Sequence, residues 1–183
     1  RIAAYQIWNE PNNENDPLNE VMGVSNSPEN YLELLAFAHN TIKSIAKKKR
    51  VVSAATTAIN QNFPESLEYN IALQDGGIES ITDIFGVHFY GYQPENIIIP
   101  NGVADYLNSM ERPIWVTESG AKGVNKQLEY AERLWPFLLD IVPKVKRIYC
   151  YQFTENSPAS STYGLKNPTP GQTVSDLYIY LRD

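Results

Sequence analysis

Cysteine and histidine are scarce in this sequence. Its one cysteine, Cys150, cannot form an internal disulfide bond, and its two histidines add too few ligands for a zinc site made of cysteine and histidine. Basic residues are also outnumbered by acidic ones, 15 to 21, which gives a formal net charge of −6. This charge has the wrong sign for a surface that neutralises phosphates or anionic lipid. The apolar runs are far shorter than the roughly 18 residues that span a membrane. We therefore expect no metal, no cofactor, no nucleic acid and no membrane as partners.

The remaining composition is typical of one globular domain. Of the 183 residues, 43% are hydrophobic and 20% are charged, and a chain of this length can bury about 70% of the surface that it exposes when unfolded. No linker of low complexity and no change of composition divides the sequence, so we treat residues 1–183 as a single domain. The chain starts at Arg1 and enters an apolar segment at once. Cellular location stays open, with secretion and the periplasm as candidates.

Short apolar segments alternate with longer segments that have a helical period. Five of the short segments are nearly continuous in apolar or aromatic residues, which is typical of strands covered on both faces. They are residues 2–8, 50–55, 84–90, 113–118 and 147–153. The alternation predicts an α/β fold of five βα units on a parallel sheet.

Helices are predicted between these strands and after the last one. The clearest begins at the N-cap Ser27, with Pro28 in its first turn, carries an apolar stripe from Tyr31 to Ile45 and closes at the basic run 47–50. Pro136 is expected to kink or divide one of the others. The other segments of helical period are 64–74, 103–110, 125–142 and 173–181.

Two glutamates occupy the same position relative to their strands. Glu10 follows the first strand in the tetrapeptide WNEP, and Glu118 ends the fourth in the tripeptide TES. They are 108 residues apart, which fits three units of 36 residues, against about 31 per unit in a typical eight-unit barrel. In a closed parallel barrel the carboxyl ends of the strands converge on one mouth. Two carboxylates there could cleave a glycosidic bond, one as the acid and the other as the nucleophile or base.

Three motifs together resemble the retaining glycoside hydrolases of clan A, which are (β/α)8 barrels. The motifs are WNEPN around Glu10, HFY from His88 to Tyr90, and WVTESG around Glu118. In that clan the acid/base follows the fourth strand and the nucleophile the seventh. The resemblance covers essentially the whole chain. It implies that residues 1–183 are the C-terminal part of a catalytic domain, an incomplete TIM-type barrel spanning strands four to eight, without the first three βα units.

The resemblance also implies roles for individual residues. Glu10 is similar to the general acid/base, Glu118 to the nucleophile, and Asn9 to the donor that binds the sugar 2-hydroxyl. Tyr90 resembles the phenol that hydrogen-bonds the nucleophile, and His88 resembles a polar wall of the sugar subsite.

The acid and the sugar platform carry further expectations. An acid/base needs a raised pKa, which burial and the second carboxylate would give to Glu10. The clan often places a tryptophan after the eighth strand to stack on the sugar, and this chain has YCYQF there. Tyr151 or Phe153 could take that place, and Trp8 could also contact the substrate or pack in the core.

The implied function is the hydrolysis of β-linked sugars by double displacement with retention, with a carbohydrate as partner. The alternative is an incomplete barrel that binds carbohydrate or is structural, and we expect the 183 residues alone to hydrolyse little or no aryl β-glycoside. An open sheet would also favour self-association through its edges and apolar face. The sugar, the linkage, and exo or endo action stay open.

Other polar and aromatic residues are expected to have structural positions. Glu155 is a rival carboxylate that fits a loop charge better, and Glu14 and Asp16 belong to an Asn-rich surface loop. Cys150 lies inside a strand and resembles a small apolar residue. Three further side chains are expected to pack or, for the histidine, to be solvated: Trp115, Trp135 and His39.

Overall fold

The computed structural model describes residues 2–59, 65–91, 94–167 and 174–183. Strands and helices alternate along the chain. The strands are β1 (Ala4–Ile7), β2 (Arg50–Ser53), β3 (Phe85–Tyr90), β4 (Ile114–Gly120) and β5 (Val145–Cys150). The helices are α1 (Pro17–Met22), α2 (Pro28–Ile45), α3 (Glu65–Asp75), α4 (Val103–Ser109), α5 (Gln127–Ile141) and α6 (Asp176–Arg182), with the 3₁₀ turns η1 (Ile78–Ser80) and η2 (Pro94–Asn96).

All strand pairs are parallel and follow chain order. β1 pairs with β2, and β3, β4 and β5 form a second group. A bridge between Val52 and Ile84 joins the two groups, and the Ser53 N–H donates to the Ile84 carbonyl at 3.1 Å. In the described part of the chain no strand pairs with the outer side of β1 or β5, so the sheet is an open arc and not a closed barrel. The predicted α/β fold with parallel strands is confirmed. That these strands are part of a TIM-type barrel stays a prediction.

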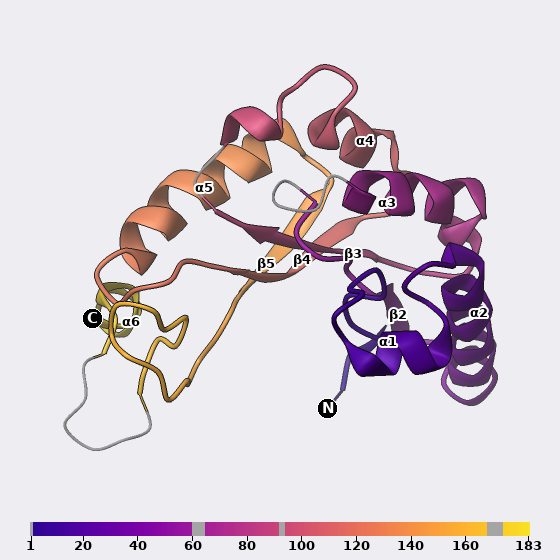
Figure 1. Ribbon diagram of the computed structural model, residues 1–183, viewed down its shortest axis with the longest axis horizontal. Coiled ribbons are helices and arrows are strands. Elements are labelled where there is room, and N and C mark those ends of the chain that lie inside the picture. The colour runs from indigo at the N-terminus through magenta and orange to yellow at the C-terminus, as the bar shows by residue number, and fades with distance from the viewer. Residues whose placement is uncertain (1, 60–64, 92–93, 168–173) are drawn as a thin grey trace.

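The two faces of the arc have different surroundings. Helices α2, α3, α4 and α5 lie along one side of the strands (Figure 1). The main core fills the space between them, and its strand members alternate with residues of the opposite face, such as Phe85, Val87 and Phe89 along β3. The opposite face carries a smaller cluster of Val52, Ile84 and Trp115. The helix-covered face therefore supplies most of the apolar burial, and the second face is available for a site.

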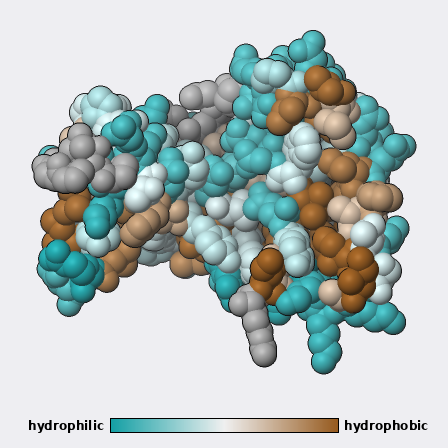
Figure 2. Space-filling model, turned by 90° about the horizontal axis from the view of Figure 1, so that it is seen from below, coloured by the Kyte–Doolittle hydropathy of each residue, from teal (hydrophilic) through white to brown (hydrophobic). Residues whose placement is uncertain are grey.

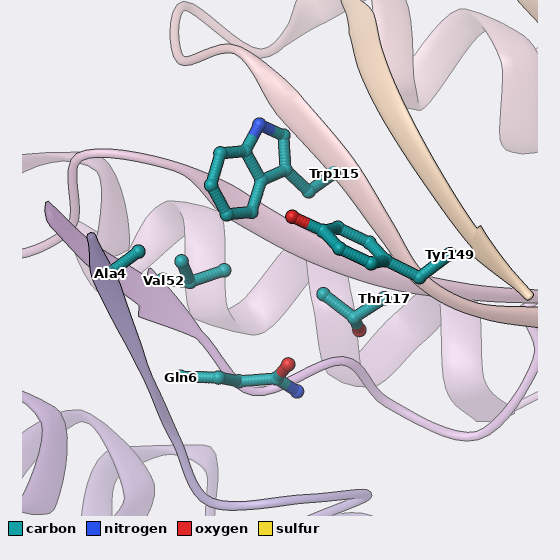
Figure 3. A pocket seen from close by; sticks show the side chains of 6 residues that line it. All are labelled: Ala4, Gln6, Val52, Trp115, Thr117 and Tyr149. Carbon is teal, nitrogen blue, oxygen red and sulfur yellow. The ribbon is translucent and has the colours of Figure 1, made fainter. Parts of the chain in front are cut away.

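A shallow hollow of about 180 Å³ lies on the second face. Its lining side chains come from β1, β2, β4 and β5. Figure 3 shows the rings of Trp115 and Tyr149 close together. Their ring centroids are 5.8 Å apart, and the Arg147 guanidinium lies 4.8 Å from the Trp115 ring. Trp115 is therefore packed, as predicted, and it lies on the second face of the sheet, opposite the helices. The lining residues are Ala4, Gln6, Val52, Trp115, Thr117 and Tyr149.

The strands occur at the predicted places with shifted ends. β1 stops at Ile7 because Trp8 turns the chain into a left-handed conformation, with φ of 75°. β4 continues to Gly120, two residues past the predicted end. β5 ends at Cys150, so the expectation that this strand reaches Phe153 was wrong.

The helices show larger differences from the prediction. α2 starts at Pro28 with Ser27 as its cap, but it ends at Ile45, so the lysines at 47–49 follow the helix instead of closing it. Ile45 is 81% exposed, and the apolar stripe that reaches the core is shorter than predicted. Helix α5 stays one element through Pro136, so the expected division is absent. The predicted helix over 173–181 starts at Asp176 as α6, and residue 173 lies outside the described residues.

Helix α1 was not predicted at all. The segment around it is rich in asparagine and resembles a loop, but the Asp16 carboxylate caps a short helix by accepting from the Leu18 N–H. Glu14 is exposed, as expected. Seen from below, the surface carries hydrophobic groups in several places among hydrophilic ones (Figure 2). None of the described helices has the length and apolarity to cross a membrane.

Candidate active site

The first carboxylate is positioned by a tight loop after β1. Trp8 and Glu10 both have positive φ angles, 75° and 41°, so the chain reverses immediately after the strand. The Glu10 N–H donates to the Ala55 carbonyl at 2.9 Å, which ties this loop to the segment after β2. Left-handed backbone at residues other than glycine is unfavourable and persists only where the surroundings fix it. The position of the Glu10 side chain therefore depends on a contact between this loop and Ala55, which is distant in the sequence.

The second carboxylate is positioned by an irregularity in β4. Val87 pairs with Val116, but His88 pairs with Glu118, so β4 contains one extra residue at Thr117. A strand without this bulge would turn Glu118 toward the helices. With the bulge, the Glu118 side chain lies on the same face of the sheet as His88, the face opposite the helices. The next residue, Ser119, faces helix α5.

The two glutamates meet around a buried histidine. The His88 Nδ1 lies 3.0 Å from Glu10 Oε1 and 3.6 Å from Glu118 Oε2. Tyr90 donates its hydroxyl to Glu118 Oε2 at 2.9 Å, and Asn13 donates its amide to Glu10 Oε2 at 3.2 Å. The nearest ligand atoms of Glu10, His88 and Glu118 all lie within 4.8 Å of one another. Both glutamates remain about one quarter exposed, so a ligand could reach them.

The charge state of Glu10 differs from the sequence-based expectation. The hydrogen bond from His88 lowers the pKa of Glu10 below its ordinary value, and the bond from Asn13 acts in the same direction. Burial acts in the opposite direction but is weaker than the His88 bond. The expectation of a raised pKa for Glu10 was therefore wrong for the free protein. The hydrogen bond from His88 lowers this pKa by more than burial raises it.

His88 is fully buried, and only one of its ring nitrogens has a partner in the described structure. Nδ1 faces both carboxylates, whereas Nε2 is buried without a hydrogen bond. A proton on Nδ1 satisfies Glu10, so this tautomer is favoured by the geometry. Burial and the charge of Glu118 together raise the pKa of Tyr90, which keeps its phenol protonated as a donor.

The same three ligand atoms of Glu10, His88 and Glu118 could hold a small metal ion, and they form the one such group found in the described residues. The donor set of two carboxylates and an imidazole suits several divalent metals. However, Nδ1 is already bonded to Glu10, and the buried Nε2 has no acceptor of the kind that usually orients a ligating histidine. The site therefore fits a proton-sharing pair better than a resident metal.

The other predicted site residues lie at different distances from this centre. Asn9 is exposed in the same loop. Tyr151 packs edge-on against Tyr90, with ring centroids 6.2 Å apart, while Phe153 lies against Tyr178 of α6. The Trp8 indole N–H donates to Asn19 at 2.7 Å, so its polar atom is used inside the protein. The structure brings Tyr151 to the site and leaves Phe153 away from it.

Three residues near the site were missed in the sequence. Tyr163 packs 5.5 Å from Tyr90 and 5.7 Å from Tyr151, and Lys122 lies 5.5 Å from its ring centroid. Asn13 contacts Glu10 directly. Asn19 donates its amide to the Glu10 carbonyl at 2.8 Å. The asparagine-rich run after Glu10 was the only available signal for the last two, and nothing in the sequence marks Tyr163.

The residues expected to be structural have structural contacts. Glu155 accepts hydrogen bonds from the Thr162 hydroxyl and the Tyr163 N–H, which hold the loop after β5. Burial raises the pKa of Cys150 to about 11, so it stays a thiol. The Trp135 indole donates to Ser119 at 2.9 Å.

No protein-family model matches the sequence, and no curated protein matches it. Solved glycoside hydrolases share its fold. A calcium-binding mutant of Bacteroides uniformis β-glucuronidase 2 gives a TM-score of 0.61 at 22% identity, covering 98% of this chain and 22% of that one. The same β-glucuronidase covalently bound to cyclophellitol-6-carboxylate aziridine gives 0.57 at 18% identity, covering 91% of this chain and 22% of that one.

A second type of glycoside hydrolase shows the same likeness. A family 39 enzyme from the gut symbiont Bacteroides cellulosilyticus gives a TM-score of 0.58 at 19% identity, covering 88% of this chain and 36% of that one. This chain therefore spans about one fifth to one third of the length of these structurally similar proteins. At such identities the likeness establishes a common fold, and the chemistry must be argued from the site itself.

Proposed function

We propose that this chain carries the catalytic residues of a retaining β-glycosidase. The observation that supports the proposal most directly is the meeting of two strand-end carboxylates, Glu10 and Glu118, whose nearest ligand atoms lie within 4.8 Å. Retaining enzymes place their carboxyl groups about 5 to 5.5 Å apart, whereas inverting enzymes need about 6.5 to 9.5 Å to admit a water. The close approach of the nearest oxygens of Glu10 and Glu118 supports retention as the mechanism to be tested.

The surroundings of each carboxylate support a division of roles. Glu118 accepts the hydroxyl of Tyr90 at 2.9 Å, which fixes the orientation of the carboxylate that would attack the sugar. Glu10 shares a 3.0 Å hydrogen bond with the buried His88, whose Nδ1 can accept this bond instead of donating it once Glu10 has taken up a proton from solvent. Bound sugar would exclude water, which disfavours the ionised carboxylate of Glu10 and favours its protonated form. Glu10 would then be the acid.

The reaction proceeds in two displacements. Glu118 attacks the anomeric carbon, the bond to the leaving oxygen breaks, and Glu10 gives that oxygen its proton. The resulting ester between sugar and Glu118 is cleaved by a water that loses a proton to Glu10, so both carboxyl groups return to their first state. Tyr151 and Tyr163 present aromatic rings next to Tyr90 and would line the sugar subsite. Asn9 is exposed in the loop of Glu10 and would reach the sugar 2-hydroxyl.

We further propose that the five strands are strands four to eight of a (β/α)8 barrel of the clan A type. The parallel arc in chain order and the likeness to the β-glucuronidase and the family 39 enzyme support this assignment. The substrate is proposed only as a β-linked sugar. Because several neighbours are β-glucuronidases, β-glucuronides belong among the substrates to be tested with glucosides, galactosides and xylosides.

Covalent labelling tests the proposal without requiring turnover. The protein is incubated with neutral cyclophellitol aziridines and with the 6-carboxylate form, and adducts are located by intact and peptide mass spectrometry. We expect one adduct on Glu118, lost in Glu118→Gln and kept in Glu14→Gln, which changes an exposed glutamate of the Glu10 loop. An adduct on Glu10 would reverse the roles, and the absence of an adduct with every reagent would reject the enzyme.

Azide rescue tests the same roles by product stereochemistry in a full-length version of the protein, because we expect the 183 residues alone to hydrolyse little or no aryl β-glycoside. For Glu118→Ala, we expect azide to restore cleavage of an activated aryl glycoside and to give the inverted glycosyl azide, because azide takes the place of the nucleophile. For Glu10→Ala, we expect the retained glycosyl azide, because azide then attacks the Glu118 ester. Exchanged outcomes would overturn the assignment.

The open arc favours one alternative, a module that binds carbohydrate without cleaving it. Such a module would bind a β-linked sugar in calorimetry and form no adduct with any reagent. It would also bind equally well after Glu118→Gln. The labelling experiment and this binding experiment together separate the two functions.

A further inference from the structure

Helix α1 has an unusual pattern of burial. Its apolar side chains lie in solvent, with Leu18 61%, Val21 81% and Met22 43% exposed. Its one buried residue in the structure is Asn19, a polar residue with no exposed surface. A helix that faces the protein through an amide instead of through apolar groups gains little from hydrophobic burial. The contacts of that amide must explain why the helix lies where it does.

The Asn19 amide is fully used by the loop of Glu10. Both hydrogens of Nδ2 donate, one to the Glu10 carbonyl at 2.8 Å and one to the Asn13 carbonyl at 2.9 Å. Oδ1 accepts the Trp8 indole N–H at 2.7 Å. The reverse orientation of the amide would direct its oxygen at two carbonyls and its NH2 at an N–H, so the network determines the orientation.

Each partner of Asn19 belongs to the loop that carries Glu10. Trp8 and Glu10 are the two residues with left-handed backbone, and Asn13 is the residue whose side chain bonds Glu10 Oε2. The side chain of Asn19 makes no bond within its own helix, which is capped by Asp16 and Gly23. The amide thus contributes to the loop and not to the helix.

We propose that Asn19 is a positioning residue that fixes the loop so that the Glu10 carboxylate meets His88 and Asn13. The proposal rests on the proposed role of Glu10 as the acid/base. Asn19 donates to the carbonyls of Glu10 and Asn13 and accepts the indole N–H of Trp8. Glu10 can then reach His88 Nδ1 at 3.0 Å only while these three bonds fix its φ angle in the left-handed region.

The test compares Asn19→Ala with Asn30→Ala. Asn30 is the matched control, because its exposed amide also donates to a backbone carbonyl next to α1, that of Gly23 at 2.8 Å. The Glu10 carboxyl group is titrated by ¹³C NMR, and hydrogen exchange is measured at the amides of Glu10 and Asn13. These two amides donate to the carbonyls of Ala55 and Glu10.

In Asn19→Ala, we expect the pKa of Glu10 to rise to the ordinary value of an exposed glutamate, because the bonds from His88 and Asn13 are lost. Exchange of both amides should accelerate by at least about tenfold, since three partly buried hydrogen bonds are removed. Asn30→Ala should change neither quantity. A pKa and exchange rates equal to those of the wild type would overturn the proposal, as would equal effects of both variants.

Asn19→Asp provides a second variant if Asn19→Ala folds poorly. It keeps the size of the side chain and the acceptor for Trp8 but replaces both donors by acceptors, so hydrogen exchange should accelerate as in Asn19→Ala. Unchanged exchange would again overturn the proposal.

The rate of aziridine labelling separates this proposal from the function itself. If the wild type is labelled at Glu118, we expect Asn19→Ala to slow labelling by at least about tenfold and Asn30→Ala to leave it unchanged. Equal rates in all three proteins would reject positioning while the enzyme stands. Absence of labelling in the wild type would reject the proposed function, and the NMR results would still decide whether Asn19 holds the loop.

Discussion

The strand that carries Glu118 is fixed from behind by a buried hydrogen-bond network, which can be broken at one atom. Ser119 follows Glu118 and has no exposed surface. Its hydroxyl accepts the Trp135 indole N–H at 2.9 Å and lies 3.1 Å from the Tyr130 hydroxyl, which donates to the Phe89 carbonyl at 3.0 Å. The network thus joins β3 and β4 to α5 directly behind the site.

Ser119→Ala removes the shared oxygen and leaves the Trp135 N–H without its acceptor. A buried donor left unsatisfied costs about 1 to 3 kcal/mol, so we expect the free energy of unfolding to fall by about 2 kcal/mol. For a domain of this size, that loss lowers Tm by about 4 to 8 °C. Thermal and urea unfolding followed by circular dichroism measure both values, and an unchanged urea m-value would show that the fold is kept.

The control is Ser44→Ala, which removes an exposed hydroxyl that bonds only the Thr41 carbonyl within α2. It should change stability by less than about 0.5 kcal/mol. If Ser119→Ala changes stability no more than this control, the network does not hold β4 in place. Adding Tyr130→Phe should cost less in Ser119→Ala than in the wild type, because both act on the same bonds.

Two further predictions concern the site itself. Tyr90→Phe removes the hydroxyl that donates to Glu118 at 2.9 Å. Aziridine labelling should then slow by about 10- to 100-fold, because a hydrogen bond to a charged group is worth about 1.5 to 3 kcal/mol. A labelling rate equal to that of the control Tyr180→Phe, which changes an exposed tyrosine, would contradict this prediction. Because the pKa of Glu10 is lowered by folding, its ionised form stabilises the protein above its ordinary pKa of 4.5, and this contribution is lost as the pH falls through the folded value. The difference in unfolding free energy between wild type and Glu10→Gln should therefore shrink between about pH 6 and pH 3 in urea titrations, and a constant difference would refute it.

The strand order and the pairing of the two glutamates could be predicted from the sequence. Strands covered on both faces leave continuous apolar runs, such as 84–90, and these runs define the parallel sheet. The carboxyl ends of parallel strands lie at one edge, so residues that follow the runs must come near one another. For this reason Glu10 and Glu118 could be expected to lie close together, while His88 and Tyr90 were assigned to the site through the resemblance to clan A enzymes.

The contacts that set the chemistry could not be predicted in this way. The pKa of Glu10 is lowered because His88 Nδ1 lies 3.0 Å from it, a distance that depends on two positive φ angles and on the amide of Asn19. Helix α1 was missed because its burial is polar and has no apolar period. Phe153 was assigned to the site because the end of β5 was extended by three residues.

The sequence by itself determined which segments are buried and at which strand ends the acidic residues occur, because burial leaves a one-dimensional pattern of apolar residues. Only the tertiary structure decided how Glu10 and Glu118 face each other, through a bulge at Thr117 and a turn fixed by Asn19. These two features are set by a shift of strand register and by hydrogen bonds of an irregular loop, neither of which leaves a periodic pattern in the sequence.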